Sequence, residues 1–413
     1  GANPTSTDDV EFVGGGITTV TRTDANKFTI TSTEADTLQS VTARGDTTNQ
    51  RILMNGSGSD AYLYVAGNAA NNQPTNNNPW LNPTPKHPFN VFNDFNHESA
   101  ATKYHVYRFI RHWLTEYKVD GFRWDLSKGF TQVNSGSNVG AWGNYDASRI
   151  AIWKNYYDSM QAVAPGSYCI LEHFGGDQEE IELANYGMLL WNNLNYESNQ
   201  NTMGYINNST LYRAYAPYKG YTKLGLISYA ESHDEERLMY KNINFGFTNS
   251  NYDVKSLNIG LQRMEALNAL MLLIPGAKMY WQFGELGYDY SINTCVNGTV
   301  NNNCRLDPKP IRWDYLQNTY RKRLKEVVGS ISRLRAYKPA VFSNQTVSNG
   351  TDISGVFVKK LVLSHNDMKV VVLANFDVTT VNTNIDFPSI GLWKNYLTGE
   401  SLQVNSINQS FTL

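Results

Sequence analysis

The chain has 413 residues, of which 17% are charged and 13% are aromatic, and its formal net charge at pH 7 is -2. It has no basic stripe that could neutralise phosphates, so we do not expect it to bind nucleic acid. It has no run of about 18 apolar residues, so no membrane span is expected. The length suits two or three domains of about 100 to 200 residues each.

The first 68 residues are rich in Thr and show no helical period. Short runs with strand-like composition are separated by Gly, Asn and Asp, which are typical of turns. We therefore predict an N-terminal β-rich segment over residues 1–68, with strands at 16–23, 26–33, 37–44, 51–56 and 61–67.

Residues 69–338 alternate helical and strand patterns. From Ser99 a helix is predicted, because apolar residues recur at spacings of three and four: Tyr104, Tyr107, Ile110, Trp113, Leu114 and Tyr117. Further helices are predicted at 145–164, 178–187 and 257–273, and strands at 118–125, 168–174, 188–193, 225–231 and 277–282. This alternation predicts an α/β domain with a parallel sheet, a (β/α)8-type barrel.

The last segment, residues 339–413, loses the helical period. Alternating apolar and polar residues predict strands at 355–364, 368–376 and 392–400. We interpret this segment as a separate β-sandwich domain.

Two of the three cysteines, Cys295 and Cys304, lie in one loop that is rich in Gly and Asn. This spacing predicts a loop-closing disulfide, which favours a secreted or periplasmic protein. The opening GANPTSTDDV lacks an initiator Met and is interpreted as a processed start. Cys169, within the apolar run YCILEHF, is expected to be a buried small hydrophobe.

Three of the predicted strands end in an acid. Asp125 closes the first, Glu172 closes the second, and Asp234 follows the strand at 225–231. In a parallel barrel the carboxyl ends of the strands face one mouth, so acids far apart in sequence can converge there. The three acids together predict a catalytic site.

Arg123 and Asp125 lie two positions apart and hence on the same face of a strand. On their own they would be interpreted as a structural ion pair. Beside a second acid, Arg123 is expected to orient Asp125 and favour its ionised form. By contrast, Glu179, Glu180 and Glu182 are interpreted as a solvated helix face, and Trp191 fits either core packing or stacking on a sugar.

Such a group of acids suits glycoside hydrolysis with retention. One carboxylate attacks the anomeric carbon, while a second carboxyl group protonates the leaving oxygen and later activates water. A third acid beside a histidine, here His233 and Asp234, can hold sugar hydroxyls in the transition state.

The segments GFRWD (121–125), ILEHF (170–174) and ESHDEER (231–237), in this order, resemble short conserved segments of the α-amylase family of glycoside hydrolases. The resemblance extends over about residues 70 to 413. It implies a retaining enzyme with Asp125 as nucleophile, Glu172 as general acid/base and Asp234 as transition-state stabiliser.

The same resemblance implies the contacts to substrate. Arg123 matches the arginine beside the nucleophile, and His233 matches the histidine that contacts the sugar at the cleavage site. Lys128 matches a lysine on the aglycone side, while Arg305 and Asp307 lie where contacts on the donor side of the sugar chain are expected.

One segment of the family pattern is missing. The family normally carries a D-x-x-x-N-H segment on an early barrel strand, and none occurs before residue 93. This segment also carries the usual calcium ligand, so we predict no metal ligands in this chain, although calcium is compatible with the family. Two alternatives follow: the Thr-rich front segment substitutes for the missing strands, or the barrel is incomplete. An incomplete barrel leaves unpaired edge strands, which favours a homo-oligomer that completes it.

The resulting hypothesis is an endo-acting hydrolase of α-1,4-glucosidic bonds in starch-like α-glucans that needs no cofactor for its chemistry. Two alternatives remain open. The chain could be a related branching, debranching or transglycosylating enzyme, or a non-hydrolytic α-glucan-binding remnant of the same fold.

Overall fold

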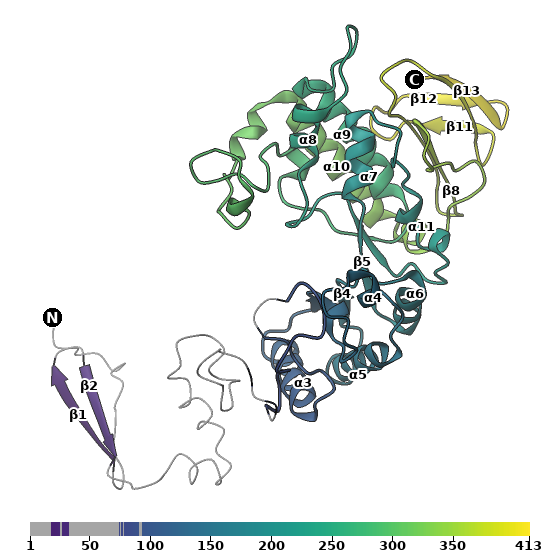
Figure 1. Ribbon diagram of the computed structural model, residues 1–413. Coiled ribbons are helices and arrows are strands. Elements are labelled where there is room, and N and C mark those ends of the chain that lie inside the picture. Colours follow the sequence, from purple (N-terminus) through teal and green to yellow (C-terminus); the bar gives the residue numbers. More distant parts are fainter. Residues whose placement is uncertain (1–17, 25–26, 33–73, 75, 77, 91–92) are drawn as a thin grey trace, which may run out of the picture. The chain divides into compact units, whose positions relative to one another are not determined.

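The computed structural model describes residues 18–24, 27–32, 74, 76, 78–90 and 93–413, whose elements are labelled in Figure 1. Contacts between residues divide the chain into two compact units, residues 1–84 and residues 85–413. The predicted domain boundaries after residues 68 and 338 remain predictions.

In the first unit, the described strands are β1 (Thr18–Asp24) and β2 (Lys27–Ser32), which pair antiparallel. The register pairs Val20 with Ile30 and shifts between Arg22 and Asp24. These strands match the first two predicted ones. The predicted strands at 37–44, 51–56 and 61–67 lie outside the described residues.

The second unit is built on a five-stranded parallel sheet in the order β3-β4-β5-β6-β7. Neighbours in the sheet are neighbours in the sequence, as in a barrel built from successive strand–helix units. The described part of the chain adds no strand outside β3 or β7, so the sheet is an open part of a barrel. Its strands are β3 (Gly121–Trp124), β4 (Tyr168–Leu171), β5 (Leu189–Asn193), β6 (Leu226–Tyr229) and β7 (Ala277–Lys278).

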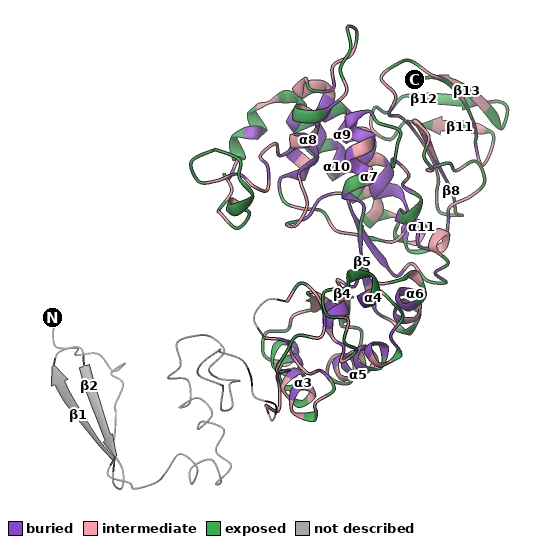
Figure 2. Ribbon diagram, in the orientation of Figure 1, coloured by how far each residue is buried: buried purple, intermediate pink, exposed green. Residues whose placement is uncertain are grey.

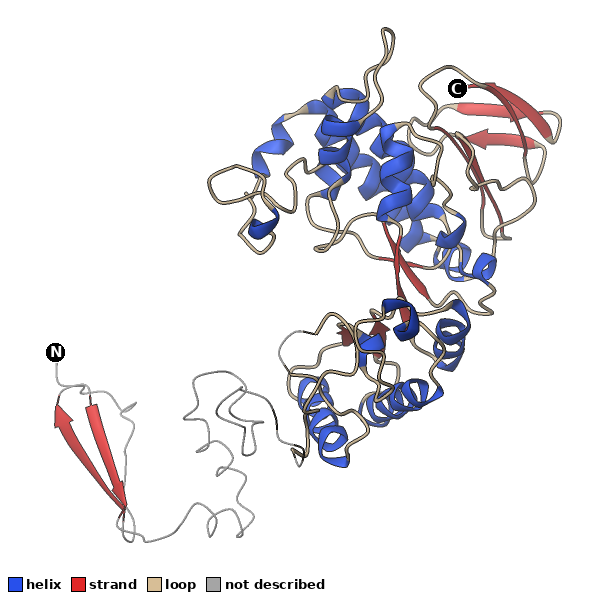
Figure 3. Ribbon diagram, in the orientation of Figure 1, coloured by secondary structure: helices blue, strands red, loops and turns tan. Residues whose placement is uncertain are grey.

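Helices connect and cover these strands (Figure 3). The α-helices are α3 (Ala100–Thr115), α4 (Val139–Trp142), α5 (Ala147–Val163), α6 (Asp177–Tyr186), α7 (Asn195–Met203), α8 (Leu238–Phe245), α9 (Leu257–Leu273), α10 (Thr319–Tyr337) and α11 (Pro339–Ser343). The 3-10 helices are η1 (Ser127–Gly129), η2 (Tyr212–Ala214), η3 (Ala216–Lys219), η4 (Gly284–Leu286), η5 (Asn302–Cys304) and η6 (Trp313–Gln317).

Helix α3 begins where the sequence predicts it, because the Ser99 side chain accepts a hydrogen bond from the Ala101 N–H at 3.2 Å. Its buried stripe differs from the predicted one. Of the six predicted apolar positions, Ile110 and Leu114 are buried. The predicted tyrosines and Trp113 are exposed, because the stripe that packs on the sheet is aliphatic and includes Val106.

The core has two large parts. One joins α3 and α5 to β4 and β5, and the free Cys169 lies within it, as predicted. The other joins α9 and α10 to the strands that follow them, through residues such as Leu267, Leu361 and Phe376. Figure 2 shows buried residues along α7, α9 and α10. The C-terminal strands therefore share a core with the helices of the barrel.

The C-terminal region is antiparallel, and Figure 3 shows the chain ending in this group of strands. Its pairs are β8 with β9, β10 with β13, and β11 with β12. The strands are β8 (Val358–Ser364), β9 (Lys369–Asn375), β10 (Asn382–Asp386), β11 (Gly391–Lys394), β12 (Ser401–Val404) and β13 (Asn408–Thr412). The strand predicted at 392–400 is in fact strand β11 followed by the turn that leads into β12.

Two further predictions can be compared with the fold. The strand predicted at 277–282 is only the two-residue β7, after which the chain leaves the sheet. Among the described residues, we find no helix that combines the length and the apolar character needed to cross a bilayer.

Candidate active site

The ends of β3 and β4 place Asp125 beside Glu172. The parallel register pairs Trp124 with Leu171, so the two acids follow at equivalent positions. Backbone hydrogen bonds continue the ladder beyond the strands, from Glu172 N to the Trp124 carbonyl and from Ser127 N to the Glu172 carbonyl, both at 3.0 Å. The predicted meeting of these two acids therefore follows from the sheet register.

One guanidinium group contacts both acids. Arg123 Nη1 forms an ion pair and hydrogen bond with Asp125 Oδ1, and Arg123 Nη2 lies 2.8 Å from Glu172 Oε1. The predicted pairing of Arg123 with Asp125 is present. The second contact, to Glu172, makes Arg123 a bridge between the two carboxyl groups.

The residue after Asp125 adopts an unusual backbone conformation. Leu126 has φ 45° and ψ 39°, a left-handed conformation that is costly for a bulky side chain. It directs the Leu126 N–H to Glu172 Oε2 at 2.8 Å. The carboxyl group of Glu172 is thus held on one oxygen by Arg123 and on the other by the backbone.

Glu172 and Asp125 have different surroundings. The Asp125 side chain is 79% exposed, whereas that of Glu172 is 12% exposed. Burial raises the pKa of Glu172 above its ordinary value, against the opposing effects of the Leu126 N–H and Arg123. The charges of Asp125 and Asp234 also raise the pKa of Glu172. Both other predicted acids therefore favour the protonated form of Glu172.

Aromatic rings support the arginine. The Arg123 guanidinium lies 5.3 Å from the centre of the Trp191 ring, which in turn packs at 4.8 Å against Tyr229. Trp191, which the sequence left between core packing and sugar stacking, thus contacts Arg123. Arg123 Nε is buried, and it has no hydrogen-bond partner among the described residues.

Asp234 lies in the segment after β6, and each of its carboxylate oxygens has a partner. His233 Nε2 lies 3.1 Å from Oδ2, and Arg305 Nη2 donates to Oδ1 at 2.5 Å. Arg305 Nη1 also donates to the Asp234 carbonyl at 3.0 Å. His233 is half-exposed and its ring is 5.7 Å from that of Trp281. The structure therefore places Arg305, predicted as a sugar contact, on Asp234.

A fourth acid, which the sequence did not single out, lies beside Asp234. Glu235 Oε1 accepts a hydrogen bond from Asn193 Nδ2 at 2.5 Å, and Oε2 accepts one from Ser232. Burial, reinforced by the charge of Asp234, raises the pKa of Glu235. The segment ESHDEER contains three glutamates, and no sequence signal shows which of them faces the end of β5.

Lys128 is more enclosed than its predicted role suggests. Its Nζ donates to the Phe174 carbonyl at 2.9 Å and lies 4.1 Å from the centre of the Trp142 ring. Burial lowers the pKa of Lys128, and the neighbouring charge of Arg149 acts in the same direction. The contact with Phe174 joins the segments that follow β3 and β4, so Lys128 links the chain on either side of the two acids.

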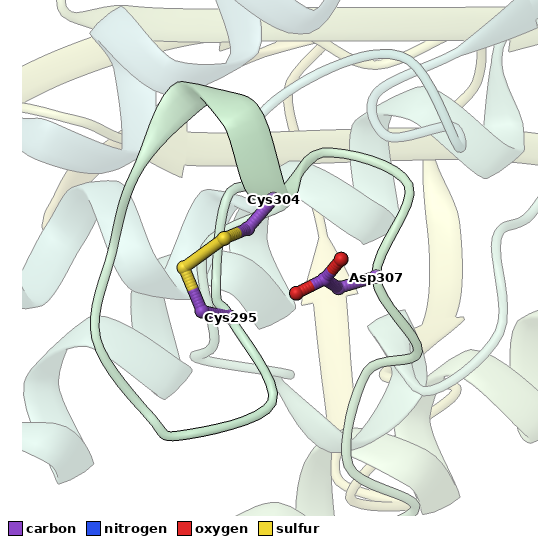
Figure 4. Close-up of side chains that lie close together, drawn as sticks. All are labelled: Cys295, Cys304 and Asp307. Carbon is purple, nitrogen blue, oxygen red and sulfur yellow. A yellow bond between two sulfur atoms is a disulfide. The ribbon is translucent and has the colours of Figure 1, made fainter.

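The predicted disulfide between Cys295 and Cys304 is present, and Figure 4 shows the Asp307 carboxylate beside it. Asp307 Oδ2 accepts a hydrogen bond from the Val296 N–H at 3.3 Å. Asp307 is thus engaged with the loop that the disulfide closes.

These three residues are also the one group of at least three His, Cys, Asp or Glu ligands that lies close together in the described part of the chain. Both sulfur atoms are bonded to each other, so neither is the thiolate that a metal ion needs. The group does not fit a metal, and the expectation that this chain carries no calcium ligands remains a prediction.

The prediction that Glu179 and Glu180 form a solvated face is wrong. Both are buried at the start of α6. Glu179 accepts hydrogen bonds from Arg149 Nε at 2.6 Å and Nη2 at 2.8 Å, and it lies 2.8 Å from His173 Nε2. Arg149 also donates to the Lys128 carbonyl at 3.2 Å. Charge pairing offsets the cost of burial, which helical spacing alone cannot reveal.

One hollow among the described residues, with a volume of about 620 Å³, does not lie at the acids. It is lined by charged residues that pair with one another, Arg312 with Asp314 and Arg321 with Asp289, each pair at 2.6 Å. None of Asp125, Glu172 and Asp234 lines it.

No family model matches this sequence, and a comparison with curated proteins gives no match either. Solved structures do match. The chain aligns with an α-amylase from Anoxybacillus at a TM-score of 0.51 and 14% identity, over 78% of this chain and 62% of that one. This chain has an α-amylase-like fold.

Two further α-amylase structures support the same fold. The α-amylase from Geobacillus thermoleovorans, solved with acarbose, aligns at a TM-score of 0.54 and 12% identity, over 81% of this chain and 69% of that one. A maltogenic α-amylase from Thermotoga neapolitana aligns at a TM-score of 0.51 and 14% identity, over 85% of this chain and 70% of that one. The α-amylase-like fold confirms the predicted α/β barrel type with a C-terminal β region, and the described residues form a five-stranded parallel part of it. The chain spans 62% of the length of the Anoxybacillus protein.

Proposed function

We propose that this chain is a retaining glycoside hydrolase that cleaves α-1,4-glucosidic bonds within starch-like α-glucans. The observation that supports this most is the bridge that Arg123 forms between Asp125 and Glu172. The Asp125 carboxyl group is exposed, whereas the Glu172 side chain is only 12% exposed and its pKa is raised. Two carboxyl groups in such different surroundings suit the separate roles of nucleophile and acid.

In the first step, an Asp125 carboxylate oxygen attacks the anomeric carbon. Glu172 gives its proton to the glycosidic oxygen as the bond from this oxygen to the anomeric carbon breaks. The shortened glucan leaves with that proton, and the sugar remains bound to Asp125 as an ester. Glu172 is now a carboxylate, held in place by Arg123 and the Leu126 N–H.

In the second step, Glu172 takes a proton from water as the water oxygen attacks the anomeric carbon. The ester bond to Asp125 breaks, and Glu172 is protonated again for the next cycle. Asp234 and His233 are proposed to bind sugar hydroxyls and to stabilise the positive charge that develops on the ring. This chemistry uses carboxyl groups and water, so no cofactor takes part.

The test is to incubate the chain with soluble starch and to follow new reducing ends, with Glu172→Gln measured in parallel. We expect the variant to lose about 10²–10⁴-fold in rate, which is the usual contribution of general acid/base catalysis. Proton NMR of the first product should show the α-anomer, because retention preserves the configuration of the substrate.

Glu182→Gln is the matched control. The Glu182 side chain is 38% exposed, and it pairs with Lys154 at 2.7 Å and not with any of the three acids. Its rate should equal that of the wild type. If Glu172→Gln releases reducing ends as fast as the wild type does, the proposal fails.

The alternative is an α-glucan-binding remnant without hydrolysis. It is favoured by the buried Arg123 Nε, which lacks a hydrogen-bond partner among the described residues, and by the open edges of the sheet. In this alternative the wild type binds starch but releases no sugar. A second copy of the chain could complete the barrel, so the oligomeric state of the active sample should be measured by light scattering.

The proposed substrate class rests on sugar-bound relatives as well as on the acids. The Geobacillus thermoleovorans enzyme was solved with acarbose. Another structure at a TM-score of 0.54 and 13% identity was solved with maltose. We also propose that the protein is exported, since the Cys295–Cys304 disulfide is compatible with an oxidising compartment.

A further inference from the structure

The loop between η4 and α10 is attached to the Asp234 segment at two separate points. Near its start, Glu236 accepts hydrogen bonds from Ser291 Oγ at 2.6 Å and from Ile292 N at 3.0 Å. Farther along, Arg305 holds the carboxylate and the carbonyl of Asp234. Two acids in one short segment after β6 are thus bound by two separate parts of a long loop.

The disulfide lies between these two attachment points. Arg305 directly follows Cys304 in the chain, so the bond to Cys295 restrains the backbone that carries the guanidinium. Within the closed loop, Cys295 N donates to the Thr299 carbonyl at 2.7 Å. Figure 4 shows how the disulfide closes the loop. The position of Arg305 is therefore tied to a covalent cross-link.

The pair between Arg305 and Asp234 has more effect on orientation than on stability. Its side chains are 41% and 39% exposed, and exposed pairs stabilise a fold by only about 0–1 kcal/mol. A planar guanidinium that binds two acceptors of one residue, however, restricts that residue to one orientation. Arg305 fixes Oδ1 and the carbonyl, which leaves Oδ2 facing His233.

We propose that Arg305 is a positioning residue for Asp234, and that the Cys295–Cys304 disulfide holds Arg305 in place. This inference rests on the proposed function, in which Asp234 stabilises the transition state. It differs from the sequence-based prediction that Arg305 contacts the sugar. A sugar contact would contribute to substrate binding, whereas a positioning residue contributes to turnover.

The test is a double-mutant cycle on soluble starch. It compares the wild type, Arg305→Gln, Cys295→Ser with Cys304→Ser, and all three substitutions together. Arg305→Gln and the cysteine variant should each lower kcat by about tenfold, the order expected for a misplaced catalytic group, with KM changed by less than about twofold. The triple variant should be no slower than Arg305→Gln, because both changes remove the same restraint.

Two outcomes would overturn the proposal. If the triple variant shows the product of the two separate losses, the disulfide and Arg305 act independently. If Arg305→Gln raises KM and leaves kcat unchanged, Arg305 binds substrate directly.

Two further variants control for general effects. Arg305→Lys keeps the positive charge but not the planar fork, so its kcat should lie between those of the wild type and Arg305→Gln. Arg323→Gln removes another exposed arginine, which pairs with Glu265 at 3.6 Å, and should leave kcat unchanged. Thermal unfolding of each variant checks that the fold is retained.

A second measurement needs no turnover. Hydrogen exchange of a peptide that covers residues 231–237 should be faster in both Arg305→Gln and the cysteine variant than in the wild type, because each change releases this segment. If the wild type does not hydrolyse starch, the proposed function fails, but the exchange rates still decide the positioning role. Unchanged exchange in both variants would contradict it.

Discussion

Asp125 and Glu172 are positioned by the sheet itself, whereas Asp234 is positioned by a loop far away in sequence. For the first two acids, the parallel register continues past the strands, and Arg123 joins residues on two adjacent strand ends. Asp234 follows β6, but its partner Arg305 comes from a disulfide-closed loop 71 residues later. Strand register can thus align two acids, while the third requires a long-range contact.

The two regions also differ in how far their charged side chains are buried. Beside the segment that follows β3, the buried Arg149 pairs with the buried Glu179 and donates to the Lys128 carbonyl. The contact of Arg305 with Asp234 is half-exposed. Changes in the buried pair should therefore affect folding, whereas changes in the loop should mainly affect the geometry of Asp234.

The largest expected effect is on turnover at the strand ends. Asp125→Asn should lower kcat on starch by about 10³-fold or more, because the nucleophile of the proposed reaction is lost. Asp234→Asn should cost less, about 10²–10³-fold, as is usual when one group that stabilises the transition state is removed. Steady-state kinetics of both variants compare the two regions directly. Equal losses would remove the distinction between them.

The next effect is on stability. Arg149→Ala should lower the free energy of unfolding by about 3–5 kcal/mol, because it leaves the buried Glu179 without its charged partner. Arg213→Ala breaks the exposed pair with Asp177 at 3.1 Å and should cost about 0–1 kcal/mol. Urea unfolding followed by circular dichroism measures both. Similar losses would mean that the buried network does not support the fold.

The loop should show a smaller effect on stability. Replacing Cys295 and Cys304 by Ser should lower the free energy of unfolding by about 2–3 kcal/mol, as expected for a cross-link that closes a short loop. The buried Cys169 makes no disulfide, so Cys169→Ala tests whether any cysteine substitution has the same effect. Urea unfolding of the oxidised proteins gives the free energy of unfolding of both variants. An unchanged free energy of unfolding after replacement of Cys295 and Cys304 would contradict the expectation.

The smallest effect concerns pH. Because the pKa of Glu172 is raised in the folded protein, ionisation of Glu172 destabilises the fold increasingly as pH rises from its unfolded pKa through its folded pKa. Glu172→Gln should therefore stabilise the protein at pH 7 by about 0.5–1 kcal/mol, a typical gain for such a replacement. Below the unfolded pKa the gain should vanish. Thermal unfolding of the wild type and of Glu172→Gln at pH 4 and pH 7 checks this difference in stability. A variant that is less stable than the wild type at pH 7 would contradict the prediction.

The sequence predicted much of the fold, because local patterns determine it. The alternation of helices and strands, the N-terminus of α3 at Ser99 and the disulfide were all predictable. The apolar stripe of α3 was placed wrongly. Aromatic residues such as Tyr104 and Tyr117 satisfy helical spacing but remain exposed, since the choice between two possible stripes depends on what the helix packs against.

The roles of Asp125, Glu172 and Asp234 remain predictions. The ends of the strands marked all three acids, and the structure places Asp125 and Glu172 at equivalent positions after β3 and β4, with Arg123 between them. The sequence did not identify Glu235, and it did not place Arg305 on Asp234. No local pattern distinguishes an arginine that binds a sugar from one that binds an acid.

The sequence by itself determined which acids follow the strands of the sheet, because short apolar runs mark where each strand ends. It also determined that Arg123 and Asp125 share a face, because side chains two positions apart in a strand point the same way. Only the tertiary structure decided which charges are buried and which are exposed. Glu179 is buried by its pairing with Arg149, and Asp125 remains exposed beside Arg123. The reason is that the cost of burying a charge depends on partners that come from distant parts of the chain.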